Sequence, residues 1–194
     1  MNSTDESIKI DRDENGTHIS VKHDAKITRG QFFELLASHK NLYKLQFFHD
    51  SKTIKVCDIV KLAPSIKILL NGNDFDHSPK GITASEVAVS EIEDLYFSWQ
   101  GRYFPKWIFT LPKLKKLELS CSEMRILPKE IYAMTKLEEL TLIWCTSMFY
   151  SIRLSELKKI KTLKWIHAVS YQMHHLQYMD IDDNLVFNIE LPQR

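Results

Sequence analysis

The 194-residue sequence has few cysteines, which cross-link small secreted domains, and few glycines, which build phosphate-binding loops. It contains only three cysteines, five glycines and six prolines. Cys57, Cys121 and Cys145 are odd in number and form no C-x-x-C pair, which favours reduced, buried thiols over a disulfide framework or a zinc site. No P-loop, G-x-G-x-x-G or G-x-S-x-G string occurs. The local signatures of nucleotide-binding proteins and of α/β-hydrolases are therefore missing.

An excess of charge of one sign and long apolar runs are missing as well. The 26 basic and 25 acidic residues leave a formal net charge of +1, which argues against a dedicated nucleic-acid binder. No apolar run approaches the ~18 residues that span a bilayer. The first seventeen residues are polar and acidic and have no apolar core of a signal peptide. We therefore expect a cytoplasmic protein without a membrane span, and delivery into a host cell stays open.

What the sequence does contain is a repeat. Residues 104–119 align with residues 127–142 at an offset of 23, with seven of sixteen positions identical, and residues 150–165 keep the apolar spacing. Each unit has an L-x-x-L-x-L pattern whose last apolar positions alternate with polar ones, as in a half-buried strand. The members of this pattern are Leu114, Leu117 and Leu119, then Leu137, Leu140 and Leu142, then Ile160, Leu163 and Trp165. Ile131 and Met134 have the spacing of a short helical turn before the strand.

These units resemble the leucine-rich repeat family, and in particular the 23-residue L-P-x-x-I repeats of bacterial and plant intracellular proteins. The resemblance covers residues 16–188 and is closest over residues 92–165. It implies an α/β fold, a solenoid or horseshoe of about seven repeats. Parallel strands would line the concave face and short helices or turns the convex face. Residues 16–194 would form this domain, and the polar residues 1–15 would be a disordered tail.

Weaker units precede and follow the clear ones. One begins at Leu42, Leu45 and Phe47, the next is expected twenty-three residues later at Ser65, Ile68 and Leu70, and a third at Ile92, Leu95 and Phe97. Thr28-x-x-Gln31 is typical of a capping box that opens a helix. The segment from Leu176 to Val186 fits either a shortened last repeat or a capping strand, and both interpretations stay open.

The resemblance places several large apolar side chains on the concave face, where a solvated surface needs none. Aromatic groups exposed together mark interaction sites, so this face is expected to bind a protein or peptide. Alternatively, these residues are core in a slipped register or pack against the terminal caps. The expected contact residues are Phe48, His49, Tyr96, Trp99, Ile143, Trp144, Ile166 and His167, with Leu69 beside them; Trp107 and Trp165 are expected in the core.

No motif predicts catalysis, a cofactor or a metal site, so the chain is expected to be a non-enzymatic binding module. Asp76-His77-Ser78 is contiguous and cannot form a relay. The segment 180–191 lacks the glycine and glutamate of a calcium loop, and the pair His174-His175 lacks metal-ligand spacing. Two alternatives are an effector that modulates a host or cellular enzyme, and a binder of anionic ligands or nucleic acid through Lys161 and Lys164. The oligomeric state stays open.

Overall fold

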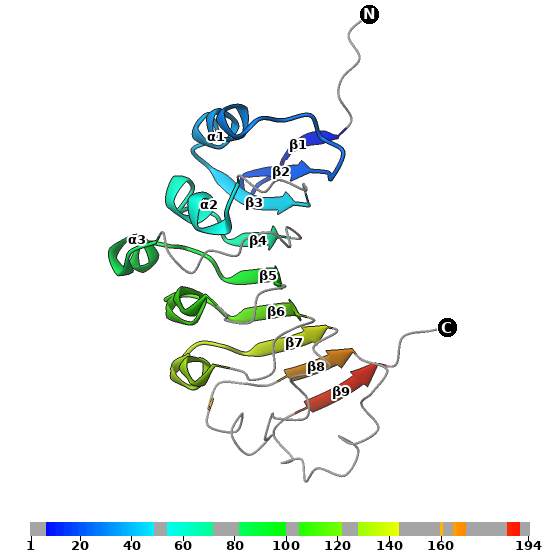
Figure 1. Ribbon diagram of the computed structural model, residues 1–194, viewed down its shortest axis with the longest axis vertical. Helices are drawn as coiled ribbons and strands as arrows, with labels where there is room; N and C mark the ends of the chain where they lie inside the picture. The colour runs from blue at the N-terminus through cyan, green and yellow to red at the C-terminus, as the bar shows by residue number, and fades with distance from the viewer. Residues whose placement is uncertain are drawn as a thin grey trace, which may run out of the picture.

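The strands form one sheet in the order in which they occur along the chain (Figure 1). The computed structural model describes residues 7–48, 54–71, 82–99, 105–121, 128–143, 160, 165–169 and 186–190. Within these ranges the strands are β1 (Ile8–Arg12), β2 (Thr17–Val21), β3 (Leu42–Phe47), β4 (Ile68–Asn71), β5 (Asp94–Trp99), β6 (Lys116–Cys121), β7 (Glu139–Ile143), β8 (Trp165–Val169) and β9 (Val186–Glu190). β1 is antiparallel to β2, and every later pair of neighbours is parallel.

Short helices connect the parallel strands and lie together on one side of the sheet (Figure 1). They are α1 (Arg29–Ala37), α2 (Val56–Leu62), α3 (Ala84–Ala88) and the 3₁₀ turns η1 (Lys106–Thr110) and η2 (Lys129–Ala133). None of the helices in the described part of the chain has the length and apolarity needed to cross a bilayer. A mostly parallel sheet with one helical element between successive strands from β2 to β7 is an α/β arrangement compatible with a leucine-rich-repeat-like solenoid.

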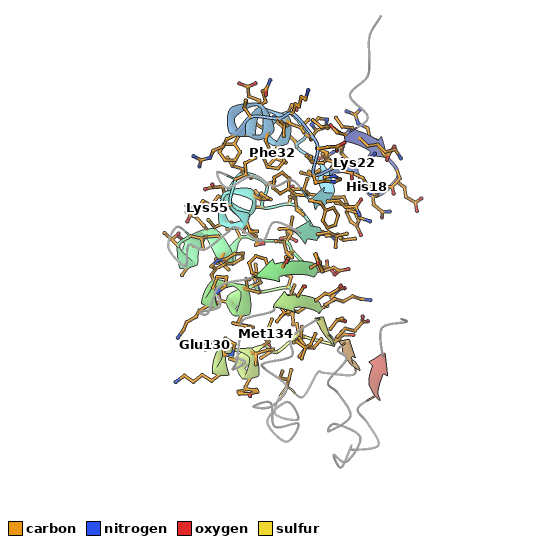
Figure 2. The ribbon with its side chains drawn as sticks, turned by 45° about the vertical axis from the view of Figure 1, so that its right-hand side comes forward. His18, Lys22, Phe32, Lys55, Glu130 and Met134 are labelled. Atoms are coloured by element: carbon orange, nitrogen blue, oxygen red, sulfur yellow. The ribbon has the colours of Figure 1, made fainter. Side chains whose placement is uncertain are left out.

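The core is a ladder in which each repeat contributes equivalent apolar positions. On the strands, Leu45, Leu95 and Leu140 occupy one buried row, and Phe47, Phe97 and Leu142 occupy the next. Each helical element contributes at least one buried residue; these include Phe32, Ile59, Val87, Ile108 and Ile131. The rings of Phe32 and Phe47 lie 4.7 Å apart between centroids, with Phe32 pointing from α1 toward the sheet (Figure 2). Each repeat therefore buries its apolar face only against its neighbours.

Local sequence signals begin α1, α3, η1 and η2. Thr28 caps α1: its hydroxyl accepts from the Gln31 amide, and the Gln31 side chain accepts from the Thr28 amide, which confirms the capping box. Thr83 and Glu86 form the same box at α3. Pro105 and Pro128 precede η1 and η2 with φ of −68° and −58°, the range to which the proline ring restricts the backbone. The turn predicted around Ile131 is confirmed as η2, from which Met134 points inward and Glu130 outward (Figure 2).

The N-terminal segment differs from the disordered tail expected over residues 1–15, because residues 8–12 form β1. A tight turn makes this hairpin. The Asp13 carboxylate accepts hydrogen bonds from the Asn15 amide at 2.8 Å and the Gly16 amide at 3.2 Å, and Gly16 adopts a φ of 143°. These bonds, led by that from Asn15, lower the pKa of Asp13. Ile8 and Ile10 alternate with polar residues and so give the strand one apolar face. The segment therefore forms a strand although most of its residues are polar.

The register of β4, in the unit expected at Ser65, Ile68 and Leu70, differs by one residue from the expected one. Leu69 was expected on the concave face, but it pairs with Leu45 and Leu95 and is 0% exposed. The inward positions are therefore Ile66 and Leu69, and Ile68 and Leu70 lie on the outer face of the sheet. The physical reason is that Ile66, Ile68, Leu69 and Leu70 are all apolar, so alternation alone cannot set the phase of this strand.

The register also differs at β8. An offset of 23 predicts Leu142 opposite Trp165, but Leu142 pairs with Ala168 and Glu139 pairs with Trp165. Ile166, expected on the concave face, pairs with the buried Leu140, and His167 pairs with Thr141. Trp165, expected in the core, takes the register position of the outer-face residue Glu139. The connection from β7 is three residues longer than in the preceding unit, so a constant period fails there.

Candidate protein-interaction surface

The face of the sheet opposite the helices presents side chains from β3 to β7 in continuous rows. Because the strands pair in register, residues at equivalent positions of successive repeats lie side by side. One row is Lys44, Ile68, Asp94, Lys116 and Glu139, and the next is Gln46, Leu70, Tyr96, Glu118 and Thr141. In these two rows the apolar residues Ile68, Leu70 and Tyr96 lie on β4 and β5, and β6–β7 carry only charged and polar ones.

Phe48, Ile68, Leu70 and Tyr96 form an apolar group on β3–β5 that we name the outer patch. Phe48 follows β3 directly and is 40% exposed, and its ring contacts that of Tyr96 from β5, with 6.4 Å between centroids and 52° between planes. Leu70 lies on the intervening strand, paired with Gln46 and Tyr96. The contact therefore crosses β4. An exposed aromatic ring held by a second ring is a preformed, low-entropy anchor for a partner.

Charged residues beside the patch are paired across neighbouring strands. Glu93 lies 3.6 Å from Lys67 and 2.6 Å from Lys115, and Lys116 lies 2.9 Å from Glu139. The hydrogen bond from Lys115 lowers the pKa of Glu93 and raises that of Lys115, and Glu139 raises the pKa of Lys116 in the same way. Lys116 and Glu139 thus pair laterally between neighbouring repeats. These lateral pairs neutralise much of the charge next to the outer patch.

Asp94 is the exception among these charges. It is half-buried beside Ile68, and burial raises the pKa of its carboxyl; Lys116 and Lys44 act in the opposite direction, and Glu139 adds to the increase. An acidic group that is partly desolvated at the border of an apolar patch is a natural partner for a donor on a bound molecule. No sequence pattern singled out Asp94, because only the strand pairing places it beside the patch.

The structure brings together two of the predicted contact residues, Phe48 and Tyr96. Trp99 and Ile143 lie on β5 and β7, and Ile166 and His167 on β8 in the shifted register, but their side chains are outside the described residues. His49 and Trp144 lie outside the described residues entirely, as do Asp76-His77-Ser78 and the basic segment Lys161–Lys164. Ile68 and Leu70 were missed as surface residues because the expected register was one residue out.

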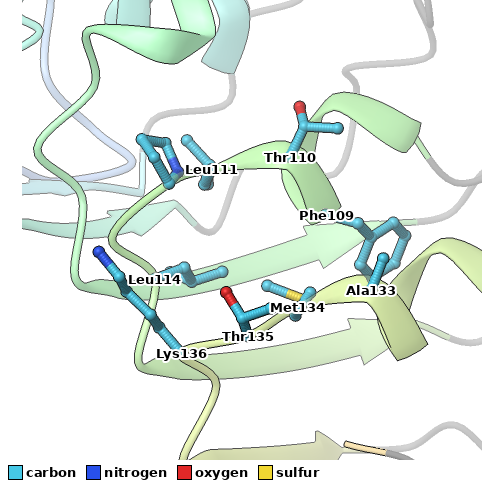
Figure 3. A pocket seen from close by; sticks show the side chains of 9 residues that line it. Phe109, Thr110, Leu111, Leu114, Ala133, Met134, Thr135 and Lys136 are labelled. Carbon is cyan, nitrogen blue, oxygen red and sulfur yellow. The ribbon is translucent and has the colours of Figure 1, made fainter.

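The helical side carries a small cavity of about 280 Å³ between η1 and η2 (Figure 3). Phe109, Leu111, Leu114 and Met134 line it together with the polar residues Thr110, Thr135 and Lys136. It contains no carboxylate, histidine or cysteine. Across the described part of the chain, no group of three or more His, Cys, Asp or Glu side chains could hold a metal ion.

Comparisons with known proteins find similarity among solved structures. No protein-family model and no curated protein matches the sequence. Among solved structures, a leucine-rich-repeat protein of Leptospira interrogans shares 13% sequence identity with a TM-score of 0.34. The match covers 91% of this chain and 61% of that chain, so this chain spans less than two thirds of the other protein.

Proposed function

We propose that this protein is a leucine-rich-repeat solenoid that binds a protein or peptide partner through the outer patch and carries out no chemistry of its own. The repeat pattern and the one-strand, one-helix architecture support the solenoid with a concave sheet face. The observation that carries the binding proposal is the Phe48–Tyr96 ring contact, because it holds an aromatic group 40% exposed on an ordered strand surface.

The patch also has the composition of an interface centre. Interfaces concentrate aromatic and aliphatic anchors in the middle and polar or charged groups at the rim. The outer patch has Phe48, Leu70 and Tyr96 in its middle, with Gln46 and Lys44 on one strand and Asp94 on another at its border. A partner that inserts an apolar side chain between the rings and offers a donor to Asp94 fits this arrangement.

Photo-crosslinking tests the proposal. A benzoylphenylalanine at position 48 should capture a defined protein, and the same group at Leu62 should not. Leu62 is a matched control because it is 44% exposed on the helical side. The captured protein, once purified, should bind Phe48→Ala and Tyr96→Ala at least about 30-fold more weakly than the parent chain, as for hot-spot anchors.

Leu62→Ala should bind like the parent chain. Equal binding by the parent, the two patch variants and Leu62→Ala would contradict the proposal, provided that circular dichroism shows all four folded. Loss of binding by Leu62→Ala alone would place the interface on the helical side instead.

A further inference from the structure

The first strand leaves one edge of the sheet open. β1 is the terminal strand of the sheet, and within the described residues no segment pairs with its outer edge (Figure 1). Exposed edge strands are templates for pairing with another strand. Ile10, in the middle of β1, is 43% exposed although it pairs with the buried Ile19. Its side chain therefore lies at the end of the apolar ladder with no next repeat to cover it.

The hydrogen bonds of the hairpin identify which backbone groups face this edge. The Lys22 amide donates to the Ser7 carbonyl, and the Asp13 amide donates to the Gly16 carbonyl. Because hydrogen-bonded and non-hydrogen-bonded pairs alternate in an antiparallel ladder, Lys9 and Asp11 also direct their backbone groups toward β2. The amides and carbonyls of Ile8, Ile10 and Arg12 consequently point away from β2, toward the open edge.

We propose that β1 pairs with β1 of a second copy of this chain, antiparallel and centred on Ile10, to form a twofold-symmetric dimer. In this register Ile10 faces Ile10 of the partner, and Ile8 faces Arg12, so all outward backbone groups meet a complementary group. Lys9 then lies opposite Asp11 of the partner, and Asp11 opposite Lys9. A twofold interface must be self-complementary, and the sequence Ile-Lys-Ile-Asp-Arg meets that requirement.

Electrostatics selects this register over its neighbours. Centring the pair on Lys9 would place Lys9 directly opposite Lys9, and centring it on Asp11 would place Asp11 opposite Asp11. Like charges directly opposite each other destabilise an antiparallel pair. Within one chain Lys9 and Asp11 are already 2.8 Å apart on one face of the strand, so the dimer would assemble four alternating charges. The twofold axis is perpendicular to the sheet, so both outer patches would face the same side.

Charge-swap mixing tests the dimer. Lys9→Asp presents two carboxylates per strand and Asp11→Lys presents two ammonium groups, so each variant alone should dimerise at least about tenfold more weakly than the parent. An equimolar mixture should recover dimers, because each Asp then faces a Lys. The measurement is sedimentation velocity over a concentration series, with native mass spectrometry to identify the heterodimer. The pair within one chain is broken in both variants, so it cannot explain recovery.

Ile10→Pro gives a second, independent readout. It removes an amide that points to the open edge and none of the bonds to β2, and proline is tolerated on edge strands in this orientation. It should abolish the dimer and preserve the circular dichroism spectrum. A parent chain that stays monomeric at high concentration would overturn the proposal. So would charge variants that dimerise like the parent, or a mixture that shows no more dimer than the separate variants.

Discussion

The rings of Phe48 and Tyr96 meet across an intervening strand, with 6.4 Å between centroids. Phe48 follows β3 and Tyr96 belongs to β5, forty-eight residues later in the chain. The contact is made possible by the parallel stacking of successive repeats, which places equivalent positions about 4.8 Å apart per strand. An aromatic pair of this kind joins repeats that are not neighbours, and it shapes the surface that we propose for partner binding.

Coupling between these two rings is open to direct measurement. Phe48→Ala, Tyr96→Ala and the double variant form a thermodynamic cycle. We expect a coupling free energy of about 0.5–1.5 kcal/mol, the range of tilted aromatic pairs. Urea unfolding followed by circular dichroism gives the free energies of unfolding of the parent and the three variants. Strict additivity of the single effects would show that the ring contact contributes nothing in solution.

The register of β4 predicts opposite outcomes for adjacent leucines. Leu69→Ala should lower the free energy of unfolding by about 2–5 kcal/mol, because Leu69 is fully buried and its truncation leaves a cavity. Leu70→Ala removes a half-buried surface side chain and should cost about 1 kcal/mol or less. Urea denaturation of both variants compares them under one condition. A larger loss of stability for Leu70→Ala than for Leu69→Ala would instead support the register in which Leu69 faces outward.

Alanine substitutions at Gly16, in the turn of the N-terminal hairpin, and at Gly30, in α1, should have different effects on stability. A Cβ at Gly16 would lie 2.6 Å from the Asn41 carbonyl oxygen, and the residue has a φ of 143°. Gly16→Ala should therefore destabilise the protein by more than about 1 kcal/mol. Gly30 lies in α1, where a Cβ would meet open space, so Gly30→Ala should be neutral or stabilising by up to about 1 kcal/mol. Thermal unfolding measures both, and equal effects would contradict the turn geometry.

Glu93 predicts a component of acid sensitivity. Its folded-state pKa is lowered, chiefly by the hydrogen bond from Lys115. A carboxyl with a lowered pKa stabilises the fold above its unfolded pKa, and this contribution disappears as the pH falls through the folded pKa. Glu93→Gln should thus be less stable than the parent at neutral pH, and the difference should shrink in acid. Urea midpoints across a pH series test this expectation. A difference that grows in acid would exclude the Lys115–Glu93 explanation.

The repeat was predictable because it depends on short-range patterns that stacking reinforces. The units at Leu114–Leu119 and Leu137–Leu142 have clear alternation and a proline before each helical turn, and both β6 and β7 pair as the offset of 23 predicts. Phe48 and Tyr96 were correctly predicted on the same face of the sheet because their units keep that pattern. The pattern weakens at β8. The connection before this strand is longer, so the offset of 23 residues no longer predicts which residues of β7 and β8 pair.

The sequence by itself determined the parallel, repeated architecture, since apolar spacing and helix capping act within a few residues. Only the tertiary structure decided which residues of β4 face inward, because that segment is apolar on both faces and its phase depends on Leu45 and Leu95 packing against Leu69. The tertiary structure also decided the conformation of Ile8–Arg12. This largely polar segment forms a strand because β2 supplies its hydrogen-bond partners. The outer patch and the open edge both follow from these long-range pairings.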